Sequence, residues 1–224
     1  TLTAFYSVLK SADQWLRFVF ITGVTKFAQM GIFSNLNQLV DISLTRPYAT
    51  LCGITLEEIE ANFEPEIEQL MESHDLPREE LLKQLTRRYD GYRFYEENVP
   101  NVFNPFSLLS VMTFHAFKNY WFATGTPTFL TEILKKTDFD LRELDGIEVS
   151  AASLSDDKAD INNPVPMIYQ SGYLTIKKYD KEFQIYTLGF PNDEVKYGFL
   201  NFVTPFYTPV ADTDTSCYIG KFIR

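Results

Sequence analysis

The sequence predicts a mixed α/β protein that is mostly helical, with one β-hairpin late in the chain. Apolar residues recur at helical spacing through much of the chain, which predicts a series of amphipathic helices. A short run at 18–21 is apolar throughout, as is typical of a strand covered on both faces, and two alternating runs at 173–179 and 183–188 predict the hairpin. Of the 224 residues, 45% are hydrophobic and 16% aromatic, so the chain can build one large core or two smaller ones, and disorder is excluded for most of it.

The chain is acidic, with 20 Lys and Arg against 30 Asp and Glu and a formal net charge of -10. Such a chain repels nucleic acid and anionic membranes on average, so binding to either would need a local basic patch. No apolar run approaches the ~20 residues of a membrane span, and no signal peptide opens the chain. The two cysteines, Cys52 and Cys217, lie far apart in sequence. We therefore predict a cytoplasmic protein with no redox pair, no zinc site and no membrane partner.

The N-terminal stretch predicts one repeat of an α/β core. Apolar residues at helical spacing over 5–16 predict a helix, and the buried strand at 18–21 follows it and closes at Thr22-Gly23. A single strand cannot form a sheet, so its neighbours must come from elsewhere. Because the first residue is Thr1 rather than Met, we also expect the chain to be part of a longer protein.

Thr22 is the polar residue placed where chemistry usually occurs in such a core. It stands at the carboxyl end of the predicted strand, which is the edge where open α/β sheets bind ligands. The alternative is that Thr22 and Gly23 only turn the chain. Spacing alone leaves both interpretations open.

Three helices are predicted in the next part of the chain. Thr55 and Glu58 have the spacing of a capping box, in which each side chain satisfies a free backbone N–H, and Pro65 breaks the helix that they begin. A second short helix follows. The third covers 79–89 and ends at Gly91, which tolerates the left-handed backbone that a helix end often needs.

The stretch 55–80 carries ten acidic residues and a single basic residue, Arg78. Its net charge of -9 accounts for most of the charge of the chain. One interpretation is a solvated helix face, and the other is a docking surface for a basic partner.

Asn104 and Pro105 predict the N-cap and first turn of a further helix. Two more helices are predicted over 126–136 and 164–171, and the polar stretch 150–163 is predicted to be a loop. The apolar face of the Asn104 helix is expected to comprise Leu108, Leu109, Met112 and Ala116.

Helices followed by a hairpin form the outline of a winged-helix module. Residues 161–200 contain four bases and four acids, so they carry no net charge. Phosphate binding needs a clear positive excess, and we therefore expect no nucleic-acid binding through this segment.

The sequence contains few catalytic signatures. His74 is predicted to be a surface residue in a loop and His115 a packed residue inside the Asn104 helix, although counting alone leaves open a hydrolase triad with Cys52 or a serine. There is no GxSxG, HExxH or CxxC pattern, so no metal site is predicted. There is also no GxxxxGK[ST] or GxGxxG loop, so this chain alone is not expected to bind nucleotide well.

Several strings nevertheless form a specific ordered set. They are FITGVTKF at 20–27, IFSNLN at 32–37, DISL at 41–44, YATLCG at 48–53, YDGY at 89–92, NPFSLL at 104–109, YWFATGTP at 120–127, SGYLTI at 171–176 and FPNDEV at 190–195. In this order, from about Phe18 to Tyr207, they resemble the predicted AAA-type ATPase-like family of bacterial proteins, which is common in Bacteroidetes. Members of that family often carry a C-terminal restriction-endonuclease-like nuclease domain.

The resemblance implies an organisation in three parts. Residues 1–45 would be the end of a P-loop ATPase α/β core, and 46–190 a helical lid with a winged-helix-like module. Residues 191–224 would be a helix or linker toward a nuclease-like domain. The phosphate loop and the magnesium-binding acidic strand of the core would then lie upstream of Thr1.

The resemblance also implies a role for Thr22. It matches the sensor position, where a polar side chain touches the γ-phosphate or the attacking water, so Thr22 and Gly23 would contact ATP and Mg²⁺ bound by the intact protein. The chain would couple nucleotide state to conformational change while being catalytically incomplete alone. Its partner would be an unknown protein or its own nuclease-like domain. The alternative is a non-enzymatic interaction module that docks a partner through its acidic helical face.

Overall fold

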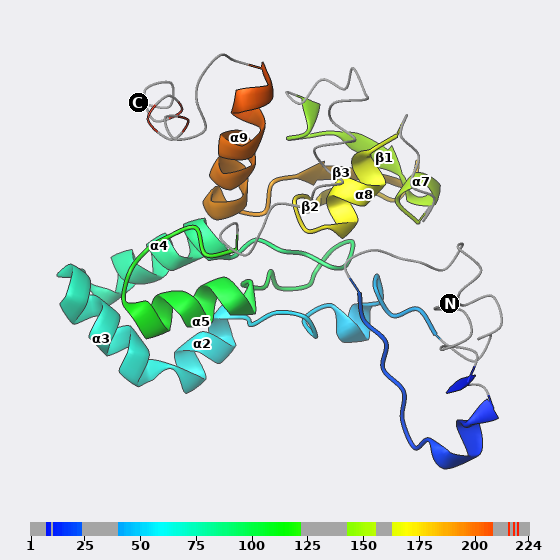
Figure 1. The fold of residues 1–224 in the computed structure, drawn as a ribbon, viewed down its shortest axis with the longest axis horizontal. Helices are drawn as coiled ribbons and strands as arrows, with labels where there is room; N and C mark the ends of the chain where they lie inside the picture. The colour runs from blue at the N-terminus through cyan, green and yellow to red at the C-terminus, as the bar shows by residue number, and fades with distance from the viewer. Residues whose placement is uncertain are drawn as a thin grey trace.

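A computed structural model of the protein describes residues 8–9, 11–23, 40–121, 143–155, 163–207, 215, 217 and 219. Its buried apolar side chains form two separate clusters. One belongs to a helical unit, made of α2 to α5, and the other to a sheet unit, made of β1 to β3 with α7 to α9 (Figure 1). The helix predicted at 126–136 lies outside the described residues, as does most of the tail that follows residue 207.

The helical unit begins with α2, Leu56–Asn62, and its start confirms the predicted capping box. The Glu58 backbone N–H donates to Thr55 Oγ1 at 3.2 Å, and the Thr55 backbone N–H donates to the Glu58 carboxylate at 2.8 Å. Each bond satisfies an N–H that a helix start leaves unpaired. α3, Glu64–His74, follows at once with Pro65 in its first turn, where a missing N–H costs nothing.

Two further helices complete this unit. α4, Arg78–Tyr89, begins with Glu79 and Glu80 and ends with Arg87 and Arg88, an order that suits the helix dipole. α5, Pro105–Phe114, is capped as predicted, because Asn104 Oδ1 accepts the Phe106 N–H at 2.9 Å. The core of the unit consists of Ile59, Ile67, Leu70, Leu81, Leu85, Tyr89, Phe103, Leu108, Val111 and Met112.

The apolar face predicted for α5 is wrong in part. Leu108 and Met112 are buried, but Leu109 is 45% exposed and Val111 takes its place in the core. Because Leu108, Val111 and Met112 are spaced i, i+3 and i+4, they form one helical stripe, from which Leu109 is turned away. The helix ends at Phe114, so His115 lies at its C-cap with a left-handed backbone (φ 49) instead of inside the helix.

The sheet is antiparallel with the order β1-β3-β2. β2, Thr175–Asp180, and β3, Ile185–Gly189, confirm the predicted hairpin with shorter strands. A bulge between Ile176 and Lys178 interrupts their register. β1, Glu148–Ser150, was not predicted and pairs with the other edge of β3. The winged-helix comparison stays a prediction.

Three helices flank this sheet. The stretch 150–163 was predicted as a loop, but its start forms the short helix α7, Ala151–Ser155, because Leu154 is buried in the core of the sheet unit. α8, Val165–Gln170, confirms the helix predicted at 164–171. α9, Asp193–Tyr207, contributes Val195, Phe199 and Val203 to the same core, whose other buried members include Tyr92, Val102, Leu144, Tyr173, Leu174, Ile176 and Leu188.

The N-terminal stretch differs most from the prediction. Asp13–Trp15 form the 3-10 helix η1, and the following residues 16–23 adopt neither helix nor strand (blue trace in Figure 1). Phe18 is 80% exposed and Phe20 52% exposed, so the prediction that 18–21 is a buried strand is wrong for the structure of this chain. The physical reason is that a strand is buried by its neighbours, and the described residues contain no strand paired with this one.

Candidate functional site

The two units meet along residues 190–196, which we call the junction segment. It leads from the end of β3 into the first turn of α9, and it contains the sequence FPNDEV that contributes to the family resemblance. One side of the segment contacts the end of α4 and residues close to α5, and the other contacts the sheet. Its contacts therefore help to hold the units together, beside those that the loop between α4 and α5 makes with the sheet through Arg93 and Thr175.

Asn192 joins the junction segment to the end of α4. Its Nδ2 donates to the backbone carbonyl of Asp90 at 2.8 Å, and its Oδ1 accepts the Val195 N–H at 3.0 Å. The second bond is an N-cap, the position at which Asn is strongly favoured, so one side chain both begins α9 and binds the helical unit.

Gly91 allows the closest backbone approach at this site. Its φ is +102°, and a Cβ on this residue would lie 2.1 Å from the carbonyl oxygen of Pro191. Only glycine avoids both the backbone strain and the clash. The helix end predicted at Gly91 is thus confirmed, and the same residue lets the units pack backbone to backbone.

Glu194 is the buried carboxylate of the junction and is 2% exposed. Its Oε1 accepts the backbone N–H of Trp121 at 2.9 Å. Burial raises the pKa of the Glu194 carboxyl, while the Ser107 hydroxyl and the backbone N–H groups of Trp121 and Tyr120 lower it in part. Among the described residues, no lysine or arginine forms an ion pair with this carboxylate.

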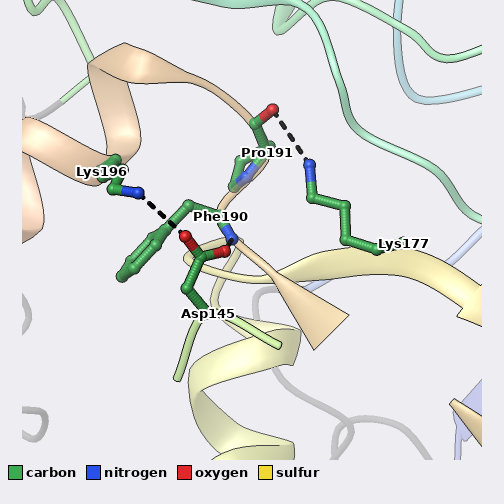
Figure 2. Close-up of polar contacts among 5 residues, drawn as sticks. All are labelled: Asp145, Lys177, Phe190, Pro191 and Lys196. Atoms are coloured by element: carbon green, nitrogen blue, oxygen red, sulfur yellow. Dashed lines mark hydrogen bonds and ion pairs between the residues drawn. The ribbon is translucent and has the colours of Figure 1, made fainter. Parts of the chain in front are cut away.

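Figure 2 shows the contacts of the junction segment with the sheet unit. Asp145 Oδ2 forms an ion pair with Lys196 Nζ at 2.9 Å, and Asp145 Oδ1 accepts the Phe190 N–H at 3.4 Å. Lys177 Nζ donates to the carbonyl of Pro191 at 3.4 Å. The bulge in β2 lies at Lys177, consistent with the use of bulges to redirect a side chain.

Lys177 is placed among several charges. Burial lowers the pKa of its ammonium, the carboxylates of Asp145 and Asp90 raise it, and the charges of Arg93 and Lys196 lower it. Burial also raises the pKa of Asp90. The junction thus contains charges of both signs. In Figure 2, Asp145 pairs with Lys196, and Lys177 donates to the Pro191 carbonyl.

The polar groups of this site make structural hydrogen bonds and ion pairs. Asn192 bonds to the end of α4, whereas the contacts of Asp145 and Lys177 with the junction segment lie within the sheet unit. Within the described ranges, no group of His, Cys, Asp and Glu could hold a metal ion, and no helix is long and apolar enough to cross a membrane.

The structure places the predicted site residues Thr22 and Gly23 on the surface, at the end of the extended stretch 16–23. Both are exposed, and no described contact joins them to the junction segment. Residues 24–39, which continue the first two strings of the resemblance, lie outside the described residues.

The two histidines are closer together than the sequence suggested. His74 is the last residue of α3, not a loop residue, and its Nε2 lies 3.0 Å from the carbonyl oxygen of His115. Its ring also contacts Phe117, with the ring centroids 4.9 Å apart. Cys52 and Cys217 are both free and exposed. None of these contacts joins a nucleophile to a base.

Sequence reasoning missed Asn192, Glu194, Asp145 and Lys177. A signal was present for the first two, because FPNDEV places a proline, a capping residue and two acids at the start of a helix. For Asp145 and Lys177 no local pattern distinguishes them from other surface charges.

Comparison with known proteins gives a limited match. Residues 1–33 match a family model described as a predicted AAA-ATPase. The chain is also 36% identical over 193 residues to an uncharacterized protein in the vnfD 5′ region of Azotobacter chroococcum mcd 1. That alignment covers 85% of this chain and 35% of the relative, so the chain spans about a third of the relative's length. No solved structure matches the chain.

Proposed function

We propose that this chain is the sensor and lid portion of an AAA-type ATPase, which couples nucleotide state to a conformational change. The observation that carries the proposal is the exposed apolar run at 18–21, which ends at Thr22 inside the stretch matched by the predicted AAA-ATPase family. The greater length of the Azotobacter relative supports a larger parent protein.

The exposure of Phe18 and Phe20 supports the proposal that another part of the intact protein covers these side chains. Large aromatic side chains bury 150–250 Å² each when covered, at roughly 25 cal/mol per Å², so leaving two of them in water is unfavourable. Neighbouring strands of an ATPase core would cover both. Thr22 would then stand at the carboxyl end of an inner strand, the edge at which such sheets bind ligands.

ATP and Mg²⁺ would be bound mainly by the rest of the intact protein, since this sequence has no phosphate loop. The residues of this chain suit one part of the task. Thr22 offers an exposed hydroxyl that can donate to a phosphate oxygen or position a water, and Gly23 lets a ligand approach the backbone. Bound Mg²⁺ would supply charge neutralisation on the phosphates.

The two-unit architecture supports the lid part of the proposal. Each unit has its own buried core, and polar contacts of the junction segment join them. Rigid units joined in this way are suited to relaying a change at one site by moving as bodies.

The test is ATP turnover by the intact protein with substitutions at Thr22. Thr22→Ala should slow hydrolysis by about 10–1,000-fold while ATP binding stays nearly unchanged, by analogy with the loss of one transition-state donor. Thr22→Ser keeps the hydroxyl and should retain most activity, whereas Thr22→Val keeps the shape and should resemble alanine. Equal turnover by all four proteins would contradict the sensor role, and an intact protein without ATP turnover would contradict the ATPase proposal.

A second candidate is an interaction module without nucleotide chemistry. It is favoured by the acidic residues of α2 and α3, most of which are exposed, while Arg78 pairs with Glu64 and lies 4.0 Å from Glu60. Apart from Glu58, whose carboxylate caps α2, the remaining exposed acidic residues could meet a basic partner. The same ATP assay separates the two candidates, because this one predicts no turnover in the intact protein.

A further inference from the structure

The contacts inside the two units differ in polarity from the contacts that connect the units. Within each unit, contacts are made mainly by fully buried apolar side chains. Between the units, the junction segment makes hydrogen bonds and ion pairs, including the Arg87–Asp193 pair at 3.1 Å, while its own Phe190 and Val195 are buried in the core of the sheet unit. Interfaces of this polar kind permit relative motion, whereas apolar cores resist it.

Glu194 is the unusual member of this connection, because it is a buried acid bound to the backbone of Trp121, whose ring contacts Tyr173 of the sheet unit while the preceding Tyr120 packs against the core of the helical unit. The Trp121 N–H donates to it at 2.9 Å, and no cation among the described residues pairs with it. Burying an ionised carboxylate without a cation is costly, since hydrogen bonds replace only part of its hydration. The ionised form therefore favours any arrangement in which water reaches this side chain.

We propose that Glu194 is a proton-sensitive latch between the units: protonation of its buried carboxyl holds α9 against Trp121 and the helical unit, and ionisation loosens that contact. The Trp121 N–H can donate to either form. The difference lies in the cost of keeping the charged form away from water.

The direction follows from the linkage between protonation and packing. Burial raises the pKa of Glu194 in the closed junction above 4.5, which is the ordinary value of a solvated glutamate side chain. The closed form thus binds the proton more tightly than the open form. Closure is most favoured below pH 4.5 and weakens as the pH rises toward the raised pKa, above which it stays constant.

Other titratable groups face this carboxyl. Tyr89 of α4, Tyr92 and Tyr120 have their pKa raised, first by burial and then by the Glu194 charge, so they stay neutral through this range. On α9 itself, Asp193 pairs with Arg87 and Lys196 pairs with Asp145. Asp90 is the second junction carboxyl with a pKa raised by burial, and it is tested separately below.

The experiment is hydrogen exchange of the intact protein without nucleotide, measured from pH 4 to pH 8 and corrected for the intrinsic exchange rate. Peptides covering Trp121 and 190–196 report the junction, and peptides of α4 report the core. Junction opening in the wild type should increase by about tenfold for each unit by which closure raises the pKa, and the core peptides should not follow.

Matched variants assign this effect to one side chain. Glu194→Gln keeps the acceptor and removes the charge, so its junction should stay closed across the whole range. Glu194→Ala leaves the Trp121 N–H without its acceptor and should open the junction at every pH. Glu182→Gln makes the same change in the exposed turn between β2 and β3 and should behave as wild type.

The latch would be overturned by a wild-type junction whose opening is the same at pH 4 and pH 8. It would also be overturned if Glu194→Gln kept the wild-type pH profile, or if Asp90→Asn alone abolished it. Should Glu194→Gln fail to fold, the pH dependence of junction opening in the wild type and in Asp90→Asn still tests the proposal. Because no nucleotide is present, these outcomes are independent of the outcome of the ATP assay.

Discussion

The two units differ in the sequence range that contributes residues to their cores. All the fully buried residues of the helical unit lie between Ile59 and Met112, in one continuous stretch. The core of the sheet unit combines Tyr92 and Val102 with residues from Leu144 to Val203. Tyr92 and Val102, which form an isolated bridge in the loop between α4 and α5, therefore belong to the core of the sheet unit.

This difference separates the parts of the fold that depend on interactions within a few residues from the parts that depend on distant segments. The helical unit is determined by caps, prolines and helical spacing, all of which act within a few residues. The sheet unit requires distant segments to arrive together, and the junction segment is the place where they meet the helical unit. Substitutions in the core, at the connection and at a cap should therefore have separable effects.

The largest effect is expected in the helical core. Leu85→Ala removes a fully buried side chain of α4 and should lower the free energy of unfolding by about 2–5 kcal/mol. If the units open separately, hydrogen exchange should lose protection in α2 to α5 while β2 and β3 keep theirs.

Leu109→Ala is the control for this substitution, because Leu109 lies on the exposed side of α5 and should change stability little. Equal loss of protection in both units after Leu85→Ala would show that the two cores unfold as one.

The next effect is expected at the connection. Gly91→Ala forces a left-handed backbone on alanine and drives its Cβ against the Pro191 carbonyl, so it should cost about 2–4 kcal/mol. Unlike Leu85→Ala, it should loosen the junction in both units, as read by exchange of peptides containing residues 90–92 and 190–196.

Gly146→Ala provides a matched comparison. Its φ of +106° is almost the same, but nothing lies within 4 Å of the added Cβ, so only the backbone strain of about 1–2 kcal/mol remains. If Gly91→Ala were no worse than Gly146→Ala, close packing at Pro191 would not be the reason for glycine.

The smallest effect is expected at the cap of α2. Thr55→Ala should cost about 1 kcal/mol, and exchange should rise in the first turn of α2 alone. Hydrogen bonds from the Thr55 backbone and side chain lower the pKa of Glu58 below 4.5. The stabilisation is therefore complete above pH 4.5 and is lost as the pH falls through the lowered pKa.

Thr55→Ser keeps the hydroxyl and should retain both the stability and its pH dependence. A Thr55→Ala variant that loses protection throughout the helical unit would mean that the cap is coupled to the core.

The elements that the sequence predicts well are those with local causes. Thr55 and Glu58, Asn104, and Gly91 each act within four residues of the helix end that they define. The same reasoning identifies the hairpin, because its turn joins adjacent strands. It misses β1, whose three residues carry no pattern of their own and are ordered by the edge of β3.

The junction could not be predicted from such patterns. Asn192 reaches Asp90 across 102 residues, and Glu194 reaches Trp121 across 73. The buried strand predicted at 18–21 illustrates the opposite error, since an apolar sequence indicates a need for burial but does not supply the covering surface. Thr22, at its end, stays a predicted site residue.

The position of α9 at the end of the described sheet unit has a consequence for synthesis on the ribosome. The core of the helical unit is complete in sequence once Met112 has been made, so it can fold while translation continues. The sheet unit must wait for Val195, Phe199 and Val203, and until then Tyr173 and Leu174 lack the helix that covers them. We therefore expect the nascent chain to carry one folded unit and one open sheet, and the last turns of α9 to end that exposure.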